Sequence, residues 1–270
     1  MVRHAAVLGS PISHSLSPVL HRAAYQALGL DWEYEKFEVR ESEIAAFLDG
    51  RDASWAGLSL TMPLKVEALA LASSATDVAR LTGAANTLIP LTPRSSPMRW
   101  HADNTDVYGI VAAVREIAPD QELHTALVLG AGATARSAIA AAQELGVSTV
   151  HVAARRVRAA AEVAHLGTSL GLEARTHDLR PHWHDADLVI STVPAEVGEE
   201  WAAQPPTDTR PVLLDVTYAP WPTPLAASWL GPVVRGHSML LWQAAEQVRL
   251  MTGMEPPVHA MRAALDAATR

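Results

Sequence analysis

The chain contains no cysteine, which excludes disulfide bonds, thiolate metal sites and a cysteine nucleophile. No run reaches the roughly 18 apolar residues that a membrane-spanning helix needs, and the first apolar stretch is too short for a signal peptide. We therefore expect a cytoplasmic protein without a membrane segment. Charged residues make up 19% of the 270 residues and hydrophobic ones 49%, a balance that supports a folded core and excludes a disordered chain.

Positive charge is also scarce, since 21 Lys and Arg stand against 29 Asp and Glu, for a formal net charge of −8. This balance argues against a general nucleic-acid binder, which needs a basic surface to neutralise phosphates. Lysine occurs only at Lys36 and Lys65, and asparagine only at Asn86 and Asn104. Lys65 and both asparagines fall in short polar segments that open or close predicted strands, which makes them candidate functional residues.

Strand and helix signals alternate along two parts of the chain. Over residues 4–118 they indicate a mainly parallel sheet covered by helices, with a hairpin loop at 90–99. A second series begins at Thr125 and includes a complete βαβ unit that ends near Ala153. Predicted strands lie at 4–8, 32–39, 56–60, 86–90, 98–101, 126–129, 149–153, 188–191, 212–215 and 233–235. Predicted helices lie at 18–28, 41–48, 64–72, 106–117, 134–145, 239–251 and 257–268.

A glycine-rich turn, Gly130-Ala131-Gly132-Ala133-Thr134-Ala135, leads from the strand at 126–129 into the next helix. Glycine at the first and third positions and alanine at the sixth match the dinucleotide-binding fingerprint. Such glycines permit a tight turn and bring backbone N–H groups close to a diphosphate at the helix N-terminus. We predict a nucleotide cofactor here, with a plain structural turn as the alternative.

The end of the strand at 149–153 indicates which nucleotide binds. An NAD enzyme usually carries an acidic residue there, which bonds the ribose hydroxyls. This chain carries Arg155, Arg156 and Arg158 and no acid. Because guanidinium groups suit a phosphate dianion, we predict NADP rather than NAD. A solvated basic helix start is the alternative.

Two serines precede the predicted helix at 18–28. Ser17 is a suitable N-cap and Pro18 a suitable first helical residue, so capping alone could explain both. A helix N-terminus with Ser15 and Ser17 in reach also suits a carboxylate ligand. Lys65 follows a predicted strand at its carboxyl end, where ligands of α/β sheets collect.

Six segments, in order along the chain, resemble motifs of the shikimate dehydrogenase family. They lie at residues 9–21, 57–65, 83–88, 104–106, 215–225 and 239–244. The resemblance implies an NADP(H)-dependent oxidoreductase of aromatic amino-acid biosynthesis that reversibly reduces 3-dehydroshikimate to shikimate. It also implies a substrate domain of residues 1–106 and 239–270, a Rossmann-like NADP-binding domain of residues 107–238, and an active site in the cleft between them.

The resemblance implies roles for particular residues. The substrate carboxylate is expected at Ser15 and Ser17, with Tyr218 nearby. The ring hydroxyls are expected at Thr61, Asn86, Asp106 and Gln243. Lys65 and Asp106 are the expected catalytic pair, and Met239 joins the glycine turn and the arginines as a cofactor contact. Chemistry agrees, because hydride addition to a ketone builds negative charge on oxygen, which an ammonium can stabilise and protonate. A guanidinium does not readily release its proton, so lysine suits this role.

The chain departs from the family pattern at four places, none of them Lys65 or Asp106. Ser59 stands where the family has Asn, and Arg22 follows the motif histidine in place of Asn. Ala133-Thr134 stands where a further Gly is common, and the family's Asn-Arg-Thr is Ala154-Arg155-Arg156 here.

Several alternatives remain open at this stage. Within the enzyme class, these are a quinate/shikimate dehydrogenase that uses NAD and an aminoshikimate dehydrogenase. From another class, a catalytically silent nucleotide-sensing regulator could retain the fold. The segment His182-Trp183-His184-Asp185 resembles a metal cluster but lacks a further ligand pattern, so we predict no metal. We expect a monomer or homodimer.

Overall fold

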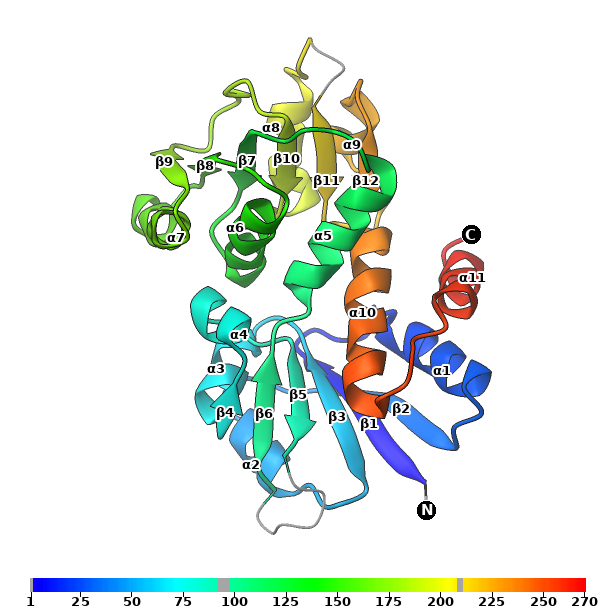
Figure 1. Cartoon of the computed structure of the whole chain (residues 1–270). Helices are drawn as coiled ribbons and strands as arrows, with labels where there is room; N and C mark the ends of the chain where they lie inside the picture. Colours follow the sequence, from blue (N-terminus) through cyan, green and yellow to red (C-terminus); the bar gives the residue numbers. More distant parts are fainter. Residues whose placement is uncertain (1, 92–97, 208–210) are drawn as a thin grey trace. The chain divides into compact units, whose positions relative to one another are not determined.

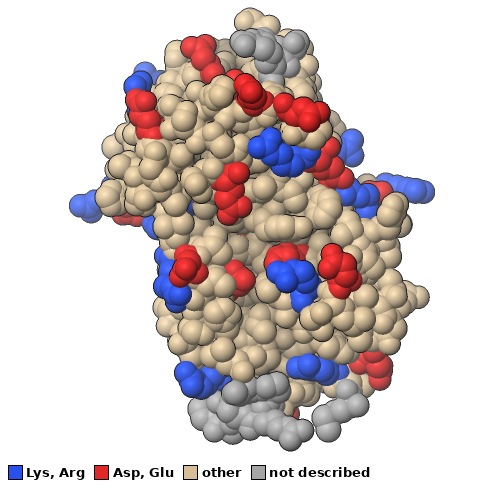
Figure 2. All heavy atoms as spheres, in the orientation of Figure 1, with Lys and Arg blue, Asp and Glu red and all other residues tan. Residues whose placement is uncertain are grey.

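A computed structural model describes residues 2–91, 98–207 and 211–270 of the chain (Figure 1). It divides into two compact units, Met1–Asp106 with Leu240–Arg270, and Val107–Met239. Among the described residues, none of the helices combines the length and apolar character required to cross a membrane. On the face drawn in Figure 2, described Lys and Arg side chains are interspersed with Asp and Glu rather than gathered into one basic patch.

The first unit contains a six-stranded sheet in the order β2-β1-β3-β5-β6-β4. Its strands are β1 (Arg3–Gly9), β2 (Trp32–Glu38), β3 (Trp55–Leu60), β4 (Ser74–Ala75), β5 (Thr87–Pro90) and β6 (Trp100–Asp103). β5 runs antiparallel to β3 and β6, and the other pairs are parallel. Its helices are α1 (Ser17–Ala27), α2 (Ile44–Asp49), α3 (Lys65–Leu71), α4 (Asp77–Thr82), most of α10 (Gly236–Thr252) and α11 (Val258–Ala268).

Strand β1 is buried because helices cover both faces of this sheet. Alternate residues of a strand point to opposite faces. Ala5 and Val7 pack in one apolar cluster with residues of α1, α10 and α11. Ala6 and Leu8 pack in another cluster with residues of α2 and α3. A strand that is buried on both faces carries apolar residues at successive positions. The apolar run at the start of the chain therefore predicted β1.

The second unit contains a fully parallel six-stranded sheet in the order β12-β11-β10-β7-β8-β9. Its strands are β7 (Thr125–Leu129), β8 (Thr149–Ala153), β9 (Glu173–His177), β10 (Leu188–Ser191), β11 (Val212–Asp215) and β12 (Val233–Arg235). Its helices are α5 (Asp106–Ile117), α6 (Ala133–Glu144), α7 (Val157–Ser169), α8 (Ala195–Ala202) and α9 (Pro224–Ser228). This is the Rossmann strand order, which reverses between β7 and β10. The predicted α/β class with a Rossmann-like part is confirmed.

Most long elements agree with their predicted ranges, and α5, β8, β10, β11 and β12 have the predicted ends. The helix α7, the short elements β4, α4, α8 and α9, and the exposed edge strand β9 were not predicted. Few apolar residues mark the short elements and β9. The helix expected at 41–48 begins only at Ile44, after a turn. β5 and β6 form the expected antiparallel pair, but residues 92–97 of their predicted loop lie outside the described residues.

Candidate active site

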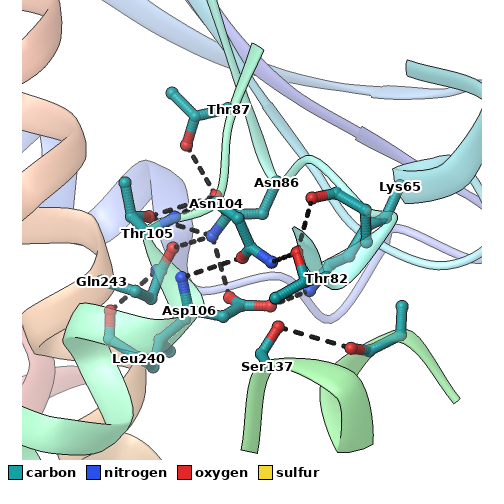
Figure 3. Close-up of polar contacts among 12 residues, drawn as sticks. Lys65, Thr82, Asn86, Thr87, Asn104, Thr105, Asp106, Ser137, Leu240 and Gln243 are labelled. Carbon is teal, nitrogen blue, oxygen red and sulfur yellow. Dashed lines mark hydrogen bonds and ion pairs between the residues drawn. The ribbon is translucent and has the colours of Figure 1, made fainter. Parts of the chain in front are cut away.

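Lys65 and Asp106 form an ion pair between Nζ and Oδ2 in the first unit (Figure 3). Each is the first residue of a helix, α3 for Lys65 and α5 for Asp106. The Lys65 side chain is 14% exposed and the Asp106 side chain 6%. Water therefore screens their charges only weakly, while a ligand can still reach the Lys65 ammonium. The Lys65 carbonyl accepts a hydrogen bond from Ala85 N at 2.8 Å, which fixes the backbone beneath the ammonium.

Asn86 connects this pair to its neighbours (Figure 3). Its Nδ2 donates to Asp106 Oδ1 at 2.8 Å, to Thr105 Oγ1 at 2.9 Å and to Gln243 Oε1 at 3.4 Å. Its Oδ1 accepts from Thr105 N and from Thr87 Oγ1, each at 2.8 Å. Acceptors surround the nitrogen and donors surround the oxygen, so one orientation of the buried amide satisfies all of them. Both carboxylate oxygens of Asp106 therefore have a side-chain donor.

Asn104 shapes the turn that presents Asp106. Its Oδ1 accepts from Asp106 N at 3.2 Å, and its Nδ2 donates to Thr82 Oγ1 at 2.9 Å. Gln243, on α10, donates from Nε2 to the Leu240 carbonyl at 2.8 Å, which directs its Oε1 toward Asn86. Four predicted site residues, Lys65, Asn86, Asp106 and Gln243, are thus held in one network.

The two predicted carboxylate serines lie at the start of α1. The capping role considered for Ser17 is wrong, because α1 begins at Ser17 itself and its N-cap, Leu16, has a helical backbone and no side-chain cap. Instead Ser15 Oγ accepts from Ser17 N at 3.4 Å. The preceding loop is held by Lys36, whose Nζ donates to the Ser13 carbonyl. Ser17 is 6% exposed, while Ser15 is half-buried.

Thr61 follows β3 and stands close to the turn before Lys65. Its backbone N donates to the Leu8 carbonyl at 2.9 Å, and its carbonyl accepts from Leu64 N at 2.9 Å. A Cβ at Gly9 would lie 2.4 Å from Thr61 Cγ2, so only glycine fits at that position. Among the described residues, the Thr61 hydroxyl has no hydrogen-bond partner. It is therefore available to a ligand, and its predicted role stays a prediction.

A buried polar layer beneath this network was not predicted. Tyr34 donates to Ser59 Oγ at 2.6 Å, and Ser59 donates to Gln247 Oε1 at 2.7 Å. Gln247 Nε2 donates to the Asn86 carbonyl at 3.1 Å and to Thr87 Oγ1 at 2.9 Å. Gln247 therefore joins α10 to the backbone that carries Asn86. The departure from the family pattern at Ser59 was the one sequence signal that pointed here.

His21 belongs to the same layer. Its ring stacks on Tyr34 with centroids 4.0 Å apart, and its Nε2 lies 3.2 Å from Gln247 Oε1. Burial lowers the pKa of His21 to about 3, against the opposing effect of the Gln247 hydrogen bond. Burial also raises the pKa of Tyr34, while hydrogen bonds with Ser59 and Ser17 oppose the rise. Both groups are therefore neutral near pH 7, as an uncharged buried layer requires.

The predicted cofactor turn in the second unit has the expected construction. Gly130 has φ of +108°, and a Cβ there would lie 2.4 Å from Thr192 Oγ1. Gly132 has open space where its Cβ would be, so a ligand can approach the backbone closely. Ala135 is fully buried, which allows α6 to pack closely on the sheet. Ala131, Ala133 and Thr134 complete the turn and are half-buried.

Three exposed arginines follow β8. Arg155 and Arg156 precede α7, and Arg158 lies in its first turn. Within the described part of the chain, none of the three forms an ion pair with an acidic residue. Their charges are therefore available to an anion. The last predicted cofactor contact, Met239, is 7% exposed in the first turn of α10.

Tyr218 follows β11 and belongs to the second unit, whereas the other predicted substrate residues belong to the first unit. Its ring lies 5.3 Å from that of His237, centroid to centroid. Buried Asp215 anchors this segment by accepting from Thr223 Oγ1 at 2.7 Å and from Thr217 N at 3.1 Å. Burial raises the pKa of Tyr218, so its hydroxyl keeps its proton at neutral pH.

Fold and sites together define the class of protein: an α/β protein with a Rossmann unit and a second unit that holds a lysine–aspartate pair in an amide and hydroxyl network. Comparisons with known proteins show which family of this class the chain belongs to. A family model of the shikimate dehydrogenase substrate binding domain matches residues 7–88, and one of the shikimate 5'-dehydrogenase C-terminal domain matches residues 236–265.

Individual relatives match nearly the whole chain. The shikimate dehydrogenase (NADP(+)) of Methanocella arvoryzae is 35% identical over 97% of both chains. The crystal structure of Mycobacterium tuberculosis shikimate dehydrogenase is 42% identical, with a TM-score of 0.85 over 98% of this chain and 99% of that one. The Thermus thermophilus enzyme, solved with NADP(H) and shikimate, is 30% identical, with a TM-score of 0.82 over 98% and 99%. The chain belongs to the shikimate dehydrogenase family, as its six motifs indicated.

Proposed function

We propose that this protein catalyses the reversible, NADPH-dependent reduction of 3-dehydroshikimate to shikimate in aromatic amino-acid biosynthesis. The observation that carries the proposal is the Lys65–Asp106 pair, held by Asn86 in a chain whose relatives are shikimate dehydrogenases (NADP(+)). We further propose that the first unit binds the substrate and the second binds NADP(H). The protein would act in the cytoplasm as a monomer or homodimer, with neither nucleic acid nor membrane as a partner.

The residues of the first unit divide the work of binding and proton transfer. Ser15 and Ser17 would hold the substrate carboxylate at the start of α1, assisted by Tyr218. Thr61, Asn86, Asp106 and Gln243 would bond the ring hydroxyls. When the carbonyl is reduced, the Lys65 ammonium stabilises the growing charge on oxygen and donates a proton to it. Asp106 keeps the ammonium in place through their ion pair.

The turn and the arginines of the second unit fit NADP(H), which supplies the hydride when bound. The turn Gly130-Ala131-Gly132-Ala133-Thr134-Ala135 would place backbone N–H groups against the diphosphate at the start of α6. Arg155, Arg156 and Arg158 would contact the 2′-phosphate, since no acid stands at the end of β8 to bond the ribose of NAD. Met239 would complete the cofactor contacts.

The proposal is tested by initial rates of the purified protein on shikimate and on quinate, each with NADP and with NAD. We expect the highest kcat/KM with shikimate and NADP. Equal rates with NAD would overturn the arginine argument and favour the NAD-dependent quinate/shikimate alternative. Cofactor binding with no absorbance change at 340 nm, the wavelength at which reduced nicotinamide absorbs, would favour the silent regulator.

A further inference from the structure

Three histidines converge in the second unit, and none of them has a role in the proposed function. His151 lies on β8, His177 ends β9, and His184 lies in the loop that follows. One ring nitrogen from each can be chosen so that all three lie within 4.8 Å of one another. His151 Nδ1 and His177 Nε2 are 2.8 Å apart, and the ring centroid of His184 lies 4.4 Å and 3.9 Å from those of His151 and His177.

Strand geometry brings His151 and His177 together. β8 and β9 are parallel, and Ala153 is the register partner of His177. Val150 and Ala174 face α7, since a Cβ at its Gly167 would lie 3.1 Å and 3.2 Å from them. Neighbouring residues of a strand face opposite ways, so both histidines lie on the other face of the sheet. The sequence places His184 beside His182 only, and its partners His151 and His177 could not be predicted without the strand β9.

The loop holds His184 against those two rings. Trp183, one residue earlier, packs edge-on against Trp201 and Trp229 with centroids 4.9 Å and 5.2 Å away. Its Nε1 also donates to the Gln204 carbonyl at 2.7 Å. His184 itself has φ of +52°, a left-handed conformation that costs a non-glycine residue roughly 1–2 kcal/mol. The chain therefore maintains an unfavourable backbone conformation where this imidazole meets the other two.

The surroundings favour neutral imidazoles, the form that binds metal ions. Burial and neighbouring positive charge lower the pKa of His151, His177 and His184, that of His184 to about 4. Nearby acids are engaged elsewhere, because Glu173 pairs with Arg175, and Asp178 pairs with Arg180 at 3.1 Å. At neutral pH each ring is therefore uncharged and has one nitrogen with a free lone pair. The proton in the hydrogen bond between His151 Nδ1 and His177 Nε2 must move to the far nitrogen of its ring if both atoms are to bind a metal ion.

We propose that His151, His177 and His184 form a binding site for a divalent transition-metal ion of the Zn²⁺ class, with water in the fourth position. Zinc binds imidazole nitrogen at about 2.0–2.1 Å, which puts tetrahedral ligand atoms about 3.3 Å apart. The His151–His177 contact at 2.8 Å must open by about half an ångström, and the wider pairs must close. An all-imidazole set suits Zn²⁺, Cu²⁺ and Ni²⁺ better than Mg²⁺ or Ca²⁺.

Calorimetric titration of the full-length, metal-free protein with Zn²⁺ tests the site, and Co²⁺ reports ligand geometry through its visible spectrum. We expect one tight Zn²⁺ per chain and a tetrahedral-type Co²⁺ spectrum. The variants His177→Gln and His184→Asn should lose both the tight Zn²⁺ binding and the tetrahedral-type Co²⁺ spectrum. Asn tolerates a positive φ, so His184→Asn should fold normally. His165→Asn is the matched control, because it makes the same change at an exposed histidine of α7 in the same unit, outside the group of three, and should bind Zn²⁺ as the wild type does.

Absence of tight Zn²⁺ binding in the wild type would overturn the proposal. Undiminished binding in both His177→Gln and His184→Asn would also overturn it, since the ion would then bind elsewhere, for instance at His4, Glu33 and Glu35. Circular dichroism shows whether each variant folds, and a misfolded His184→Asn leaves His177→Gln to decide. These readouts do not depend on dehydrogenase activity.

Discussion

The two lysines of the chain have different environments. Lys65 is mostly buried and paired with Asp106, whereas Lys36 is exposed and donates to the Ser13 carbonyl. The scarcity of lysine and asparagine, together with motif order, predicted Lys65 and Asn86 as site residues, and the structure places them in one network. The partners Thr105 and Gln247 were not predicted as site residues, because their contacts with Asn86 depend on the packing of elements that are far apart in sequence.

At the residue scale, Arg155 is one of the three arginines that would contact the 2′-phosphate of NADP in the proposed function. Arg155→Ala should lower the preference for NADP over NAD by about 10–100-fold, since a hydrogen bond to a charged group contributes about 1.5–3 kcal/mol. The measurement is kcat/KM with each cofactor at saturating shikimate. Arg40→Ala, an exposed arginine of the first unit, is the control and should leave the preference unchanged. An unchanged preference in Arg155→Ala would remove this residue from the cofactor site.

His21 gives a prediction for acid stability. Its pKa is about 3 in the folded protein and near 6.5 in the unfolded chain, so the unfolded chain binds more protons between these values. Stability must therefore fall as the pH drops from about 6.5 toward 3, by up to about 1.4 kcal/mol per pH unit from this residue alone.

Urea unfolding of the wild type and of His21→Gln at pH 7 and pH 5 measures that contribution. We expect the wild type to lose roughly 2 kcal/mol more than the variant between the two values. His259→Gln, a change at an exposed histidine on α11, should behave like the wild type. If His21→Gln and the wild type lost equal stability, His21 would not be a buried neutral group.

At the scale of elements, the position of α10 relative to β3 and β5 depends on polar contacts far apart in sequence. The apolar pattern predicted the helix, but no local pattern shows that Gln247 faces Ser59, Asn86 and Thr87. Such pairings follow from how elements pack, which explains why the helices were predictable and the buried layer was not. The edge strand β9 was missed for a related reason, since its residues are mostly exposed and do not form an apolar run.

A double-mutant cycle on Tyr34 and Ser59 tests the buried layer. Ser59→Ala removes one partner of the Tyr34 hydroxyl, which also bonds Ser17, and one donor to Gln247, so it should cost about 1–3 kcal/mol of unfolding free energy. Tyr34→Phe combined with Ser59→Ala should cost less than the sum of the single changes, because both partners of one hydrogen bond are then gone. Strict additivity in urea unfolding would show that the two hydroxyls do not interact.

At the scale of the whole molecule, two units with separate sheets and apolar cores carry different parts of the proposed chemistry. The strand order of the second unit follows from its run of βα repeats, which makes a Rossmann-like part predictable. The first unit was harder to predict, because the antiparallel strand β5 lies inside an otherwise parallel sheet. Four of the proposed substrate and catalytic residues nevertheless meet there in one network.

Hydrogen–deuterium exchange separates the roles of the two units. Shikimate alone should slow amide exchange in peptides around Ser15, Asn86 and Asp106 of the first unit. NADP alone should slow exchange at the start of α6 and after β8 in the second unit. A bound ligand suppresses local opening where it makes contacts, so protection marks its site. Protection of the second unit alone by shikimate would contradict the proposed roles.

The central claim, that Lys65 is the proton donor to the reacting oxygen, is tested most directly by the turnover of Lys65→Met. We expect kcat to fall by about 10²–10⁴-fold, the usual scale for a positioned acid–base group. NADP binding and the circular dichroism spectrum should stay unchanged. Lys36→Met replaces the other lysine and should retain kcat within about threefold, since Lys36 only holds the loop at Ser13. A Lys65→Met enzyme with near-normal kcat would contradict the claim.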